Sequence, residues 1–306
     1  GGVGMKGSAT RDEDFIEHIY IANTHSTLLL FTQKGRCYWL KVYEIPEGNR
    51  TSKGRAIQNI LMIDPDDAVR AYVNVKTLKD EEFINNNYIM MVTRKGVVKK
   101  TSLEAYSRPR TNGVNAINIR EDDELLEAIL TNGRCGIMIA AHGGRCVRFD
   151  ESETRPLGRT STGVRGINLD EGDYVVGVVC QDPQAEDVEK HQVLAVSENG
   201  YGKRSDPMDY RQTSRGAKGV RTLNITEKTG SLVAIKNVTD EDDLMIICRS
   251  GMTIRMPVNT IRVAGRATQG VKLINIREGD SIAAISVVEH SEEEESQAAE
   301  GSVAEE

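Results

Sequence analysis

Long apolar runs and paired cysteines are both missing from this chain of 306 residues. Apolar stretches such as Tyr174 to Cys180 are no longer than seven residues, whereas a membrane-spanning helix needs about 20. The chain does not open with a charged segment followed by an apolar one, so no secretory signal is visible. The five cysteines include no Cys-x-x-Cys pair. This argues against a disulfide framework and a zinc site, and it favours a reducing cytoplasm.

Catalytic signatures are missing as well. The sequence has no Gly-x-Ser-x-Gly, P-loop or His-Glu-x-x-His motif, and its five histidines do not share the spacing of a metal site. His142, beside two glycines, is interpreted as a hairpin residue. The recurring acidic turns lack the ligand spacing of an EF-hand loop, so we interpret them as solvated turns. Aromatic residues make up 5% of the chain without a stacking pattern, which disfavours single-stranded nucleic acid as a ligand.

Charge is unevenly distributed along the sequence. Residues 289–306 contain eight Glu and no Lys or Arg, and the net charge of the whole chain is −7. Residues 1–288 therefore carry a net charge of +1, because the remaining 38 acidic residues face 39 basic ones. The simplest interpretation is a folded body of 1–288 with a disordered, solvating acidic tail. A tail that competes with polyanions for a basic surface of the same chain is the alternative.

Pairs of glycines recur through the body of the chain and define a repeat. The first members are Gly35, Gly96, Gly144, Gly200 and Gly251, and the second members are Gly54, Gly113, Gly163, Gly219 and Gly270. The partners are separated by 19, 17, 19, 19 and 19 residues. Successive first glycines lie 61, 48, 56 and 51 residues apart, so the chain contains five full units of about 50 residues.

Each unit is predicted to consist of strands. Two β-rich runs meet at a tight turn that ends in the first glycine, as in Tyr88–Lys100, and Asn199-Gly200 is the dipeptide preferred by a type I′ hairpin. Two further apolar runs follow the second glycine. No segment has the periodicity of a capped helix, and the polar insertions 76–87 and 182–190 are interpreted as exposed loops. Four strands per unit predict an all-β propeller.

The opening residues 1–22 match only the second half of another unit. Gly4 stands where a second glycine falls, and the apolar run Phe15–Ala22 follows an acidic turn. We therefore expect six blades, the first of them incomplete.

Basic residues recur at fixed distances from these glycines. An Arg lies four positions before most of the second glycines, further cations flank the same glycines, and another cation lies four positions after most of the first glycines. Equivalent positions in a propeller lie at the same radius and height, so the repeats predict a positive belt that binds polyanions by their backbone. The candidate DNA-binding residues are Arg50, Lys53, Arg55, Lys100, Arg108, Arg110, Arg148, Arg159, Arg165, Arg204, Arg215, Lys218, Arg221, Arg255, Arg266 and Lys272.

Long segments of the chain resemble the C-terminal domain of the DNA gyrase A subunit, which is part of a type IIA DNA topoisomerase. The likeness spans essentially all of 1–288, and it is carried by residues 14–50, by NGYGKRSDPMDYRQTSRGAKGV (199–220) and by VAGRATQGVKLINIREGD (263–280). The resemblance implies a six-bladed β-pinwheel, which is a propeller-like disc whose neighbouring blades exchange strands. Its basic rim would bind, bend and wrap duplex DNA in a positive superhelical sense. The whole enzyme could then introduce negative supercoils by ATP-dependent strand passage.

The family's seven-residue box, Gln-Arg-Arg-Gly-Gly-x-Gly, is represented here only by Gly1, Gly2 and Gly4. The resemblance therefore implies a piece that begins inside the first blade. It implies no catalytic residue and no cofactor in this domain, because ATP and Mg would bind elsewhere in the enzyme. The implied partners are duplex DNA, the rest of the gyrase A subunit, and the gyrase B subunit, in an A2B2 heterotetramer of the bacterial cytoplasm and nucleoid.

Two alternatives remain open at this point. The C-terminal domain of topoisomerase IV is built from similar blades and usually lacks the box. A protein-interaction propeller whose arginines meet acidic partners is the other possibility, and salt dependence would separate it from a DNA-binding disc.

Overall fold

Five small antiparallel sheets make up the part of the chain that the computed structural model describes, residues 26–41 and 61–289. Each of the first four sheets has four strands, and the fifth has three among the described residues. From one edge to the other, the first sheet consists of β3 (Val69–Val75), β1 (Thr27–Thr32), β2 (Arg36–Lys41) and β6 (Val114–Asn115), and the second of β7 (Leu125–Thr131), β4 (Tyr88–Thr93), β5 (Val97–Ser102) and β10 (Val164–Arg165). The third sheet consists of β11 (Val175–Gln181), β8 (Gly136–Ala141), β9 (Arg145–Asp150) and β14 (Val220–Arg221), and the fourth of β15 (Leu232–Val238), β12 (Gln192–Ser197), β13 (Tyr201–Ser205) and β18 (Val271–Lys272). The fifth sheet consists of β19 (Ile282–Val288), β16 (Asp243–Cys248) and β17 (Thr253–Pro257).

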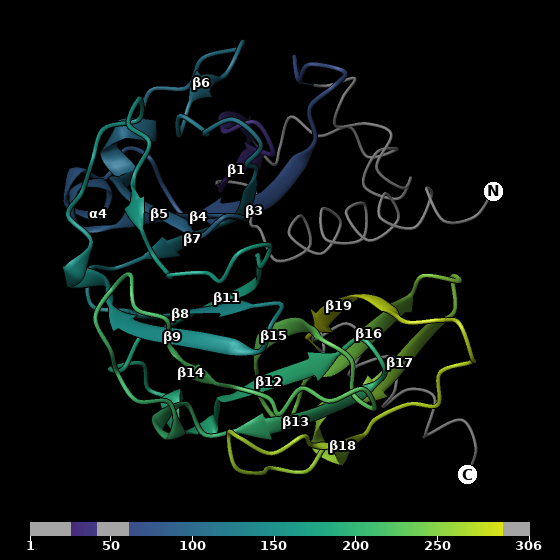
Figure 1. The fold of residues 1–306 in the computed structure, drawn as a ribbon. Coiled ribbons are helices and arrows are strands. Elements are labelled where there is room, and N and C mark those ends of the chain that lie inside the picture. The colour runs from purple at the N-terminus through teal and green to yellow at the C-terminus, as the bar shows by residue number, and fades with distance from the viewer. Residues whose placement is uncertain (1–25, 42–60, 290–306) are drawn as a thin grey trace, which may run out of the picture.

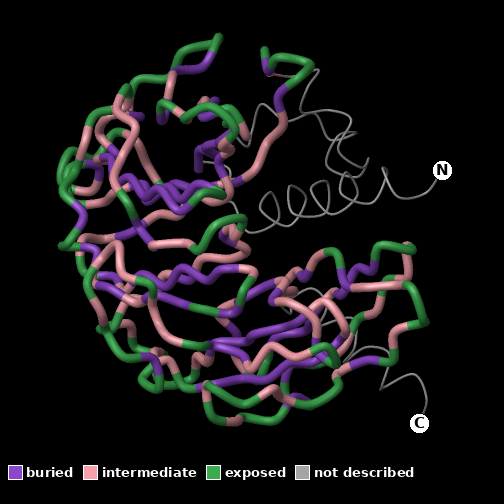
Figure 2. Tube along the Cα trace, in the orientation of Figure 1, coloured by how far each residue is buried: buried purple, intermediate pink, exposed green. Residues whose placement is uncertain are grey.

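The sheets follow one another around an open arc, in the manner of propeller blades (Figure 1). Strands β3, β7, β11, β15 and β19 of successive blades contact one another and form the inner side of the arc. The apolar core lies between neighbouring blades: Leu29 and Phe31 of β1 pack in one cluster with Ile89 and Met91 of β4. In Figure 2 the buried residues follow these strands, while exposed residues occupy the turns and the outer loops. The prediction of an all-β propeller is confirmed.

Neighbouring blades exchange strands. The outer strand of each four-stranded sheet belongs, by its place in the sequence, to the next repeat unit: β6 pairs with β2, β10 with β5, β14 with β9 and β18 with β13. Strands β6, β14 and β18 lie on the outer side of the arc (Figure 1). Each exchanged strand begins directly after a second glycine, and these glycines have positive φ values of 72, 99, 81 and 76°. The second glycines therefore recur because the crossing between blades requires a left-handed backbone.

Two sequence predictions about the architecture are corrected. The described residues form five blades and not six, and the incomplete first blade assigned to 1–22 lies outside them. The insertion 76–87 is not simply an exposed loop, since it contains the short helix α4 (Glu81–Asn86), whose Ile84 is buried. Asp80 caps this helix by accepting a hydrogen bond from the Phe83 backbone N–H at 3.2 Å. The insertion 182–190 ends in a 3₁₀ turn, Val188–Lys190.

The hairpins of the blades turn at the first glycines, as predicted, but the turn type differs from the expected one. A type I′ turn needs positive φ at both central residues. At Asn199-Gly200 only the glycine has it, at 89°, and the Gly200 N–H donates to the Ser197 carbonyl at 3.1 Å. This is a type I turn followed by a left-handed glycine, which produces a bulge at the start of the second strand. His142 lies in the corresponding turn between β8 and β9, as predicted.

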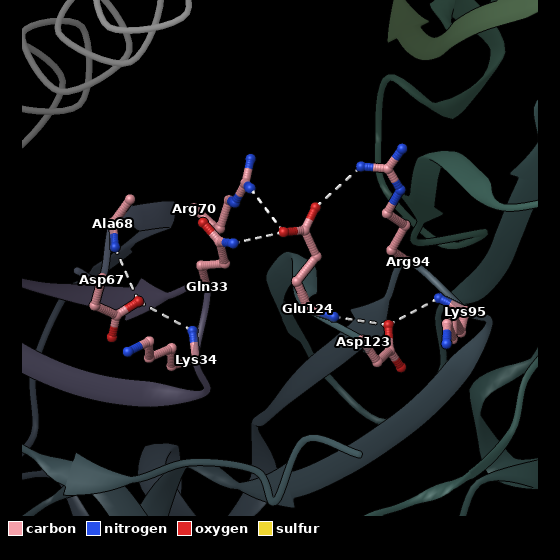
Figure 3. Close-up of polar contacts among 9 residues, drawn as sticks. All are labelled: Gln33, Lys34, Asp67, Ala68, Arg70, Arg94, Lys95, Asp123 and Glu124. Carbon is pink, nitrogen blue, oxygen red and sulfur yellow. Dashed lines mark hydrogen bonds and ion pairs between the residues drawn. The ribbon is translucent and has the colours of Figure 1, made fainter. Parts of the chain in front are cut away.

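The acidic turns are structural elements of the blade and not merely solvated. Asp67, Asp123, Asp173 and Asp280 each accept a hydrogen bond from a backbone N–H of the hairpin turn at 3.0 to 3.1 Å. Figure 3 shows two of these contacts, from Lys34 to Asp67 and from Lys95 to Asp123. The same carboxylates also accept from the N–H of the following residue. The recurring Asp therefore ties the inner strand of a blade to its hairpin.

Glu124 connects the first two blades near the inner strands (Figure 3). Its carboxylate accepts a hydrogen bond from Gln33 Nε2 at 2.6 Å, and it pairs with Arg70 at 3.1 Å and with Arg94 at 3.2 Å. We expect Glu124→Gln to lower the free energy of unfolding by about 1–2 kcal/mol, because both ion pairs lose their charge. Urea denaturation measures this, with the exposed Glu121→Gln as the matched control. If both changes lowered the free energy of unfolding equally, the conclusion that Glu124 links the blades would be wrong.

Candidate nucleic-acid interface

Cations gather along a surface that we call the outer rim. It consists of the exchanged strands β6, β10, β14 and β18 together with the segments that precede them, residues 107–113, 155–163, 211–219 and 262–270. In three of these segments a 3₁₀ turn ends in a buried residue, Thr154, Tyr210 or Ile261, and the chain then emerges at the surface. The residue that follows is an arginine each time.

These arginines are Arg155, Arg211 and Arg262, and they are not among the residues predicted from the sequence. All three are exposed, and none has a side-chain partner among the described residues. Each lies 11 positions after a first glycine, so the same repeat alignment that identified the other cations would have found them. Their exposure and free donors make them suited to contact an anion from outside the disc.

The exchanged strands carry a second row of exposed cations. Arg165, Arg221 and Lys272 occupy the last position of β10, β14 and β18. Lys218 is exposed nearby and pairs weakly with Asp170 at 3.6 Å. Arg110 is exposed, while Arg108 is engaged by Glu104 at 2.6 Å. The structure thus brings these predicted residues to the rim.

Arg159, Arg215 and Arg266 are half-buried links between blades. Arg159 donates to the Asn115 carbonyl at 3.2 Å and Arg215 to the Arg165 carbonyl at 2.8 Å, while Arg266 donates to the Arg221 carbonyl. Each acceptor lies on the strand that the preceding unit has exchanged. As members of the predicted positive belt these three arginines are expected to be exposed, and this expectation is wrong because they are half-buried. They hold the exchanged strands in place, and their remaining N–H groups lie at the same rim.

Three of the four cations that lie four positions after the first glycines point into the blades, and the fourth, Arg255, is exposed. Lys100 and Arg204 are only 4% and 6% exposed. Lys100 donates to the Glu151 carbonyl at 3.1 Å, and Arg204 donates to the Ile261 carbonyl at 2.9 Å. Arg148 similarly donates to the Tyr210 carbonyl at 2.9 Å, and Arg255 pairs with Asp243 at 2.8 Å. Lys100, Arg148 and Arg204 therefore do not belong to an exposed belt, because they stabilise the 3₁₀ turns, whereas Arg255 is exposed and pairs with a neighbouring strand.

Several predicted residues lie outside the described part of the chain: Arg50, Lys53, Arg55, Gly1, Gly2, Gly4 and the acidic tail from residue 290 onward. In the described ranges 26–41 and 61–289, no cluster of His, Cys, Asp or Glu has an arrangement that could hold a metal ion. Within the same ranges, no helix is long and apolar enough to cross a membrane.

The repeat units match a known family model. The model of the DNA gyrase C-terminal domain, beta-propeller, matches residues 26–72, 87–132, 137–182, 191–239 and 242–289, which is most of the chain. This chain belongs to the DNA gyrase C-terminal domain family. The resemblance stated from the sequence is thereby confirmed, and each matched segment contains the hairpin of one observed blade.

Curated relatives of this gyrase C-terminal domain are A subunits of DNA gyrase. The chain is 44% identical over 288 residues to the DNA gyrase A subunit of Staphylococcus epidermidis, covering 94% of the chain and 31% of the relative. It is 42% identical over 305 residues to the DNA gyrase A subunit of Staphylococcus aureus, covering 100% of the chain and 34% of the relative. The chain thus spans about a third of the length of these relatives.

Solved structures of two related domains have the same fold. The C-terminal domain of DNA topoisomerase IV superimposes with a TM-score of 0.78 at 27% identity, covering 90% of this chain and 84% of that one. A DNA gyrase A C-terminal domain superimposes with a TM-score of 0.70 at 23% identity, covering 87% of this chain and 84% of that one. The second likeness concerns the fold alone.

Proposed function

We propose that this domain binds duplex DNA through the phosphate backbone along the outer rim, and that it bends and wraps the duplex around the disc. The observation that carries the proposal is that exposed cations recur at equivalent places of successive blades. They form two rows, Arg155, Arg211 and Arg262 in one and Arg165, Arg221 and Lys272 in the other. Regularly spaced cations without a base-reading element suit a backbone-bound and bent duplex.

In the whole gyrase this wrap would present a DNA segment for ATP-dependent strand passage, which introduces negative supercoils. The partners proposed are the remainder of the gyrase A subunit, together with the gyrase B subunit, in an A2B2 heterotetramer in the bacterial cytoplasm at the nucleoid. The domain itself would be non-catalytic, with ATP and Mg bound elsewhere.

Ligation of a nicked plasmid with increasing amounts of the domain tests the proposal. After deproteinisation, a positive shift in linking number shows chiral wrapping by these blades. DNA retardation without a shift would leave a DNA-binding disc that does not wrap. This is the behaviour expected for a topoisomerase IV type of domain, and the structural likeness to that enzyme's C-terminal domain keeps it as the second candidate. No retardation would contradict DNA binding and favour an acidic protein partner.

Salt dependence provides an independent measure. For six to ten phosphate contacts, the affinity should fall by about 10³ to 10⁵ between 50 and 200 mM salt. A flat salt dependence would argue against binding through phosphates.

A further inference from the structure

Two lysines beneath the rim are buried without a carboxylate partner in the described chain. Lys99 of β5 is 0% exposed and Lys203 of β13 is 1% exposed. Both lie three positions after a first glycine, and the other units have Tyr38, Val147 and Ile254 at that place. Neither lysine was among the predicted site residues, because a basic residue in a strand carries no sign in the sequence that it is buried.

Each ammonium group is surrounded by backbone carbonyls of the rim or of the residue next to it. Lys99 Nζ donates to Ala116 at 2.6 Å, to Arg159 at 2.9 Å and to Ser161 at 3.2 Å. Lys203 Nζ donates to Gly265 at 2.7 Å, to Thr268 at 2.8 Å and also to Arg266. In both cages one acceptor is the carbonyl of a rim arginine, Arg159 or Arg266. Since a buried ammonium needs all three donors paired, the two cages constrain each loop at several points.

We infer that Lys99 and Lys203 are positioning residues for DNA binding: their charged ammonium groups hold the rim loops of the next blade in the shape that presents its cations. This inference rests on the proposed function, because it concerns the same rim. A neutral amine has only two N–H donors for three carbonyls. Loss of the proton therefore loosens the cage and removes a positive charge close to the DNA surface.

The electrostatic surroundings place this protonation step near neutral pH. Burial and then the Arg159 guanidinium lower the pKa of Lys99 to about 8. Burial and then Arg266 lower the pKa of Lys203 to about 8, against a smaller opposite effect of Asp209. Between about pH 8 and pH 10.5 the unfolded chain keeps these two lysines protonated while the folded chain loses their protons. The free energy of unfolding should therefore rise over this range. DNA affinity should fall over the beginning of the same window, since bound phosphates favour the charged lysines.

The inference is testable because the folding stability should rise with pH while the DNA affinity falls. We expect the affinity for a fluorescein-labelled linear duplex, measured at constant ionic strength, to fall about tenfold from pH 7 to pH 9.5 if binding raises each pKa by about half a unit. The variant Lys99→Met/Lys203→Met should bind weakly at pH 7 and show a flat profile. The control Lys79→Met/Lys190→Met removes two exposed charges outside the rim and should keep the wild-type profile. If the DNA affinity of the wild type and of the buried-lysine variant changed with pH in the same way, the inference would be overturned. It would also be overturned if the stability and the DNA affinity of the wild type both fell as the pH rises.

A second measurement needs no variant. In the wild-type chain labelled with ¹³C at lysine Cε, two resonances should titrate near pH 8, and their midpoints should rise when the duplex is added. Midpoints that DNA leaves unchanged would refute the positioning role even though binding occurs. Absence of any DNA binding at pH 7 would instead contradict the proposed function, so the two failures are distinguishable.

Discussion

Replacing Arg155, Arg211 and Arg262 together with alanine should weaken the binding of duplex DNA by about 100-fold at 100 mM salt. Each phosphate contact contributes about 0.9 to the slope of log affinity against log salt concentration, so three lost contacts should reduce that slope by about 2.7. The folding stability should remain within about 0.5 kcal/mol, because the three side chains are exposed and unpaired within the described chain. Fluorescence anisotropy titrations at several salt concentrations measure both the affinity and the slope.

The control is a variant that removes the same charge from other exposed sites. Lys79, Lys190 and Arg249 are exposed and lie outside the rim segments, so their joint replacement with alanine should change the slope little. If both triple variants lose the same slope, overall charge and not the rim determines the affinity. If neither loses it, the three arginines do not contact phosphates.

A triple alanine variant of Arg159, Arg215 and Arg266 distinguishes arginines that contact DNA from arginines that stabilise the rim. These arginines donate to carbonyls of the exchanged strands, so their removal should lower both the DNA affinity and the free energy of unfolding. Leaving three carbonyls without these donors costs about 1 kcal/mol each. A loss of affinity without a loss of stability is therefore the signature expected only for the first triple variant.

The fold could be predicted from the sequence to the extent that backbone geometry imposes a residue type. Gly200 is required at a left-handed turn position, and Gly163 at the crossing between blades, so their spacing revealed the hairpins and the number of full units. The exchange of strands left no such sign, because β10 follows β9 in the chain whether it pairs with β9 of its own unit or with β5 of the neighbouring blade. It was implied by the family resemblance and is observed in the pairing of Val164 with Val98.

The site was harder to predict because the sequence does not show which way a cation points. Arg204 and Arg211 lie seven residues apart, yet the first is buried against Gln192 and Asp240, while the second is exposed. The difference depends on partners in other strands and turns. A buried cage of carbonyls cannot be predicted from the sequence either. The acceptors of Lys203 are backbone atoms about 60 residues away, and any residue type can supply them.

Gly219→Ala should be among the most destabilising single changes in the described chain. A Cβ atom at this position would lie 2.3 Å from the Cys146 carbonyl oxygen, and the backbone has φ +81°. The left-handed conformation costs a non-glycine residue about 1–2 kcal/mol, and overpacking against fixed backbone adds a similar amount, so we expect a loss of about 3 kcal/mol in the free energy of unfolding. The change should also displace β14, which begins at the next residue and carries Arg221.

Gly172→Ala is the matched control for this prediction. Gly172 has φ +78°, but a Cβ atom there would meet nothing within 4 Å. It should therefore show only the conformational cost of about 1–2 kcal/mol. Urea denaturation followed by circular dichroism gives both values, and DNA retardation of the folded variants reports on the position of Arg221. Equal losses for the two glycines would mean that the recurrence of the second glycine reflects backbone conformation alone. A larger loss at Gly219 would show that close approach between exchanged strand and neighbouring blade is what requires a glycine there.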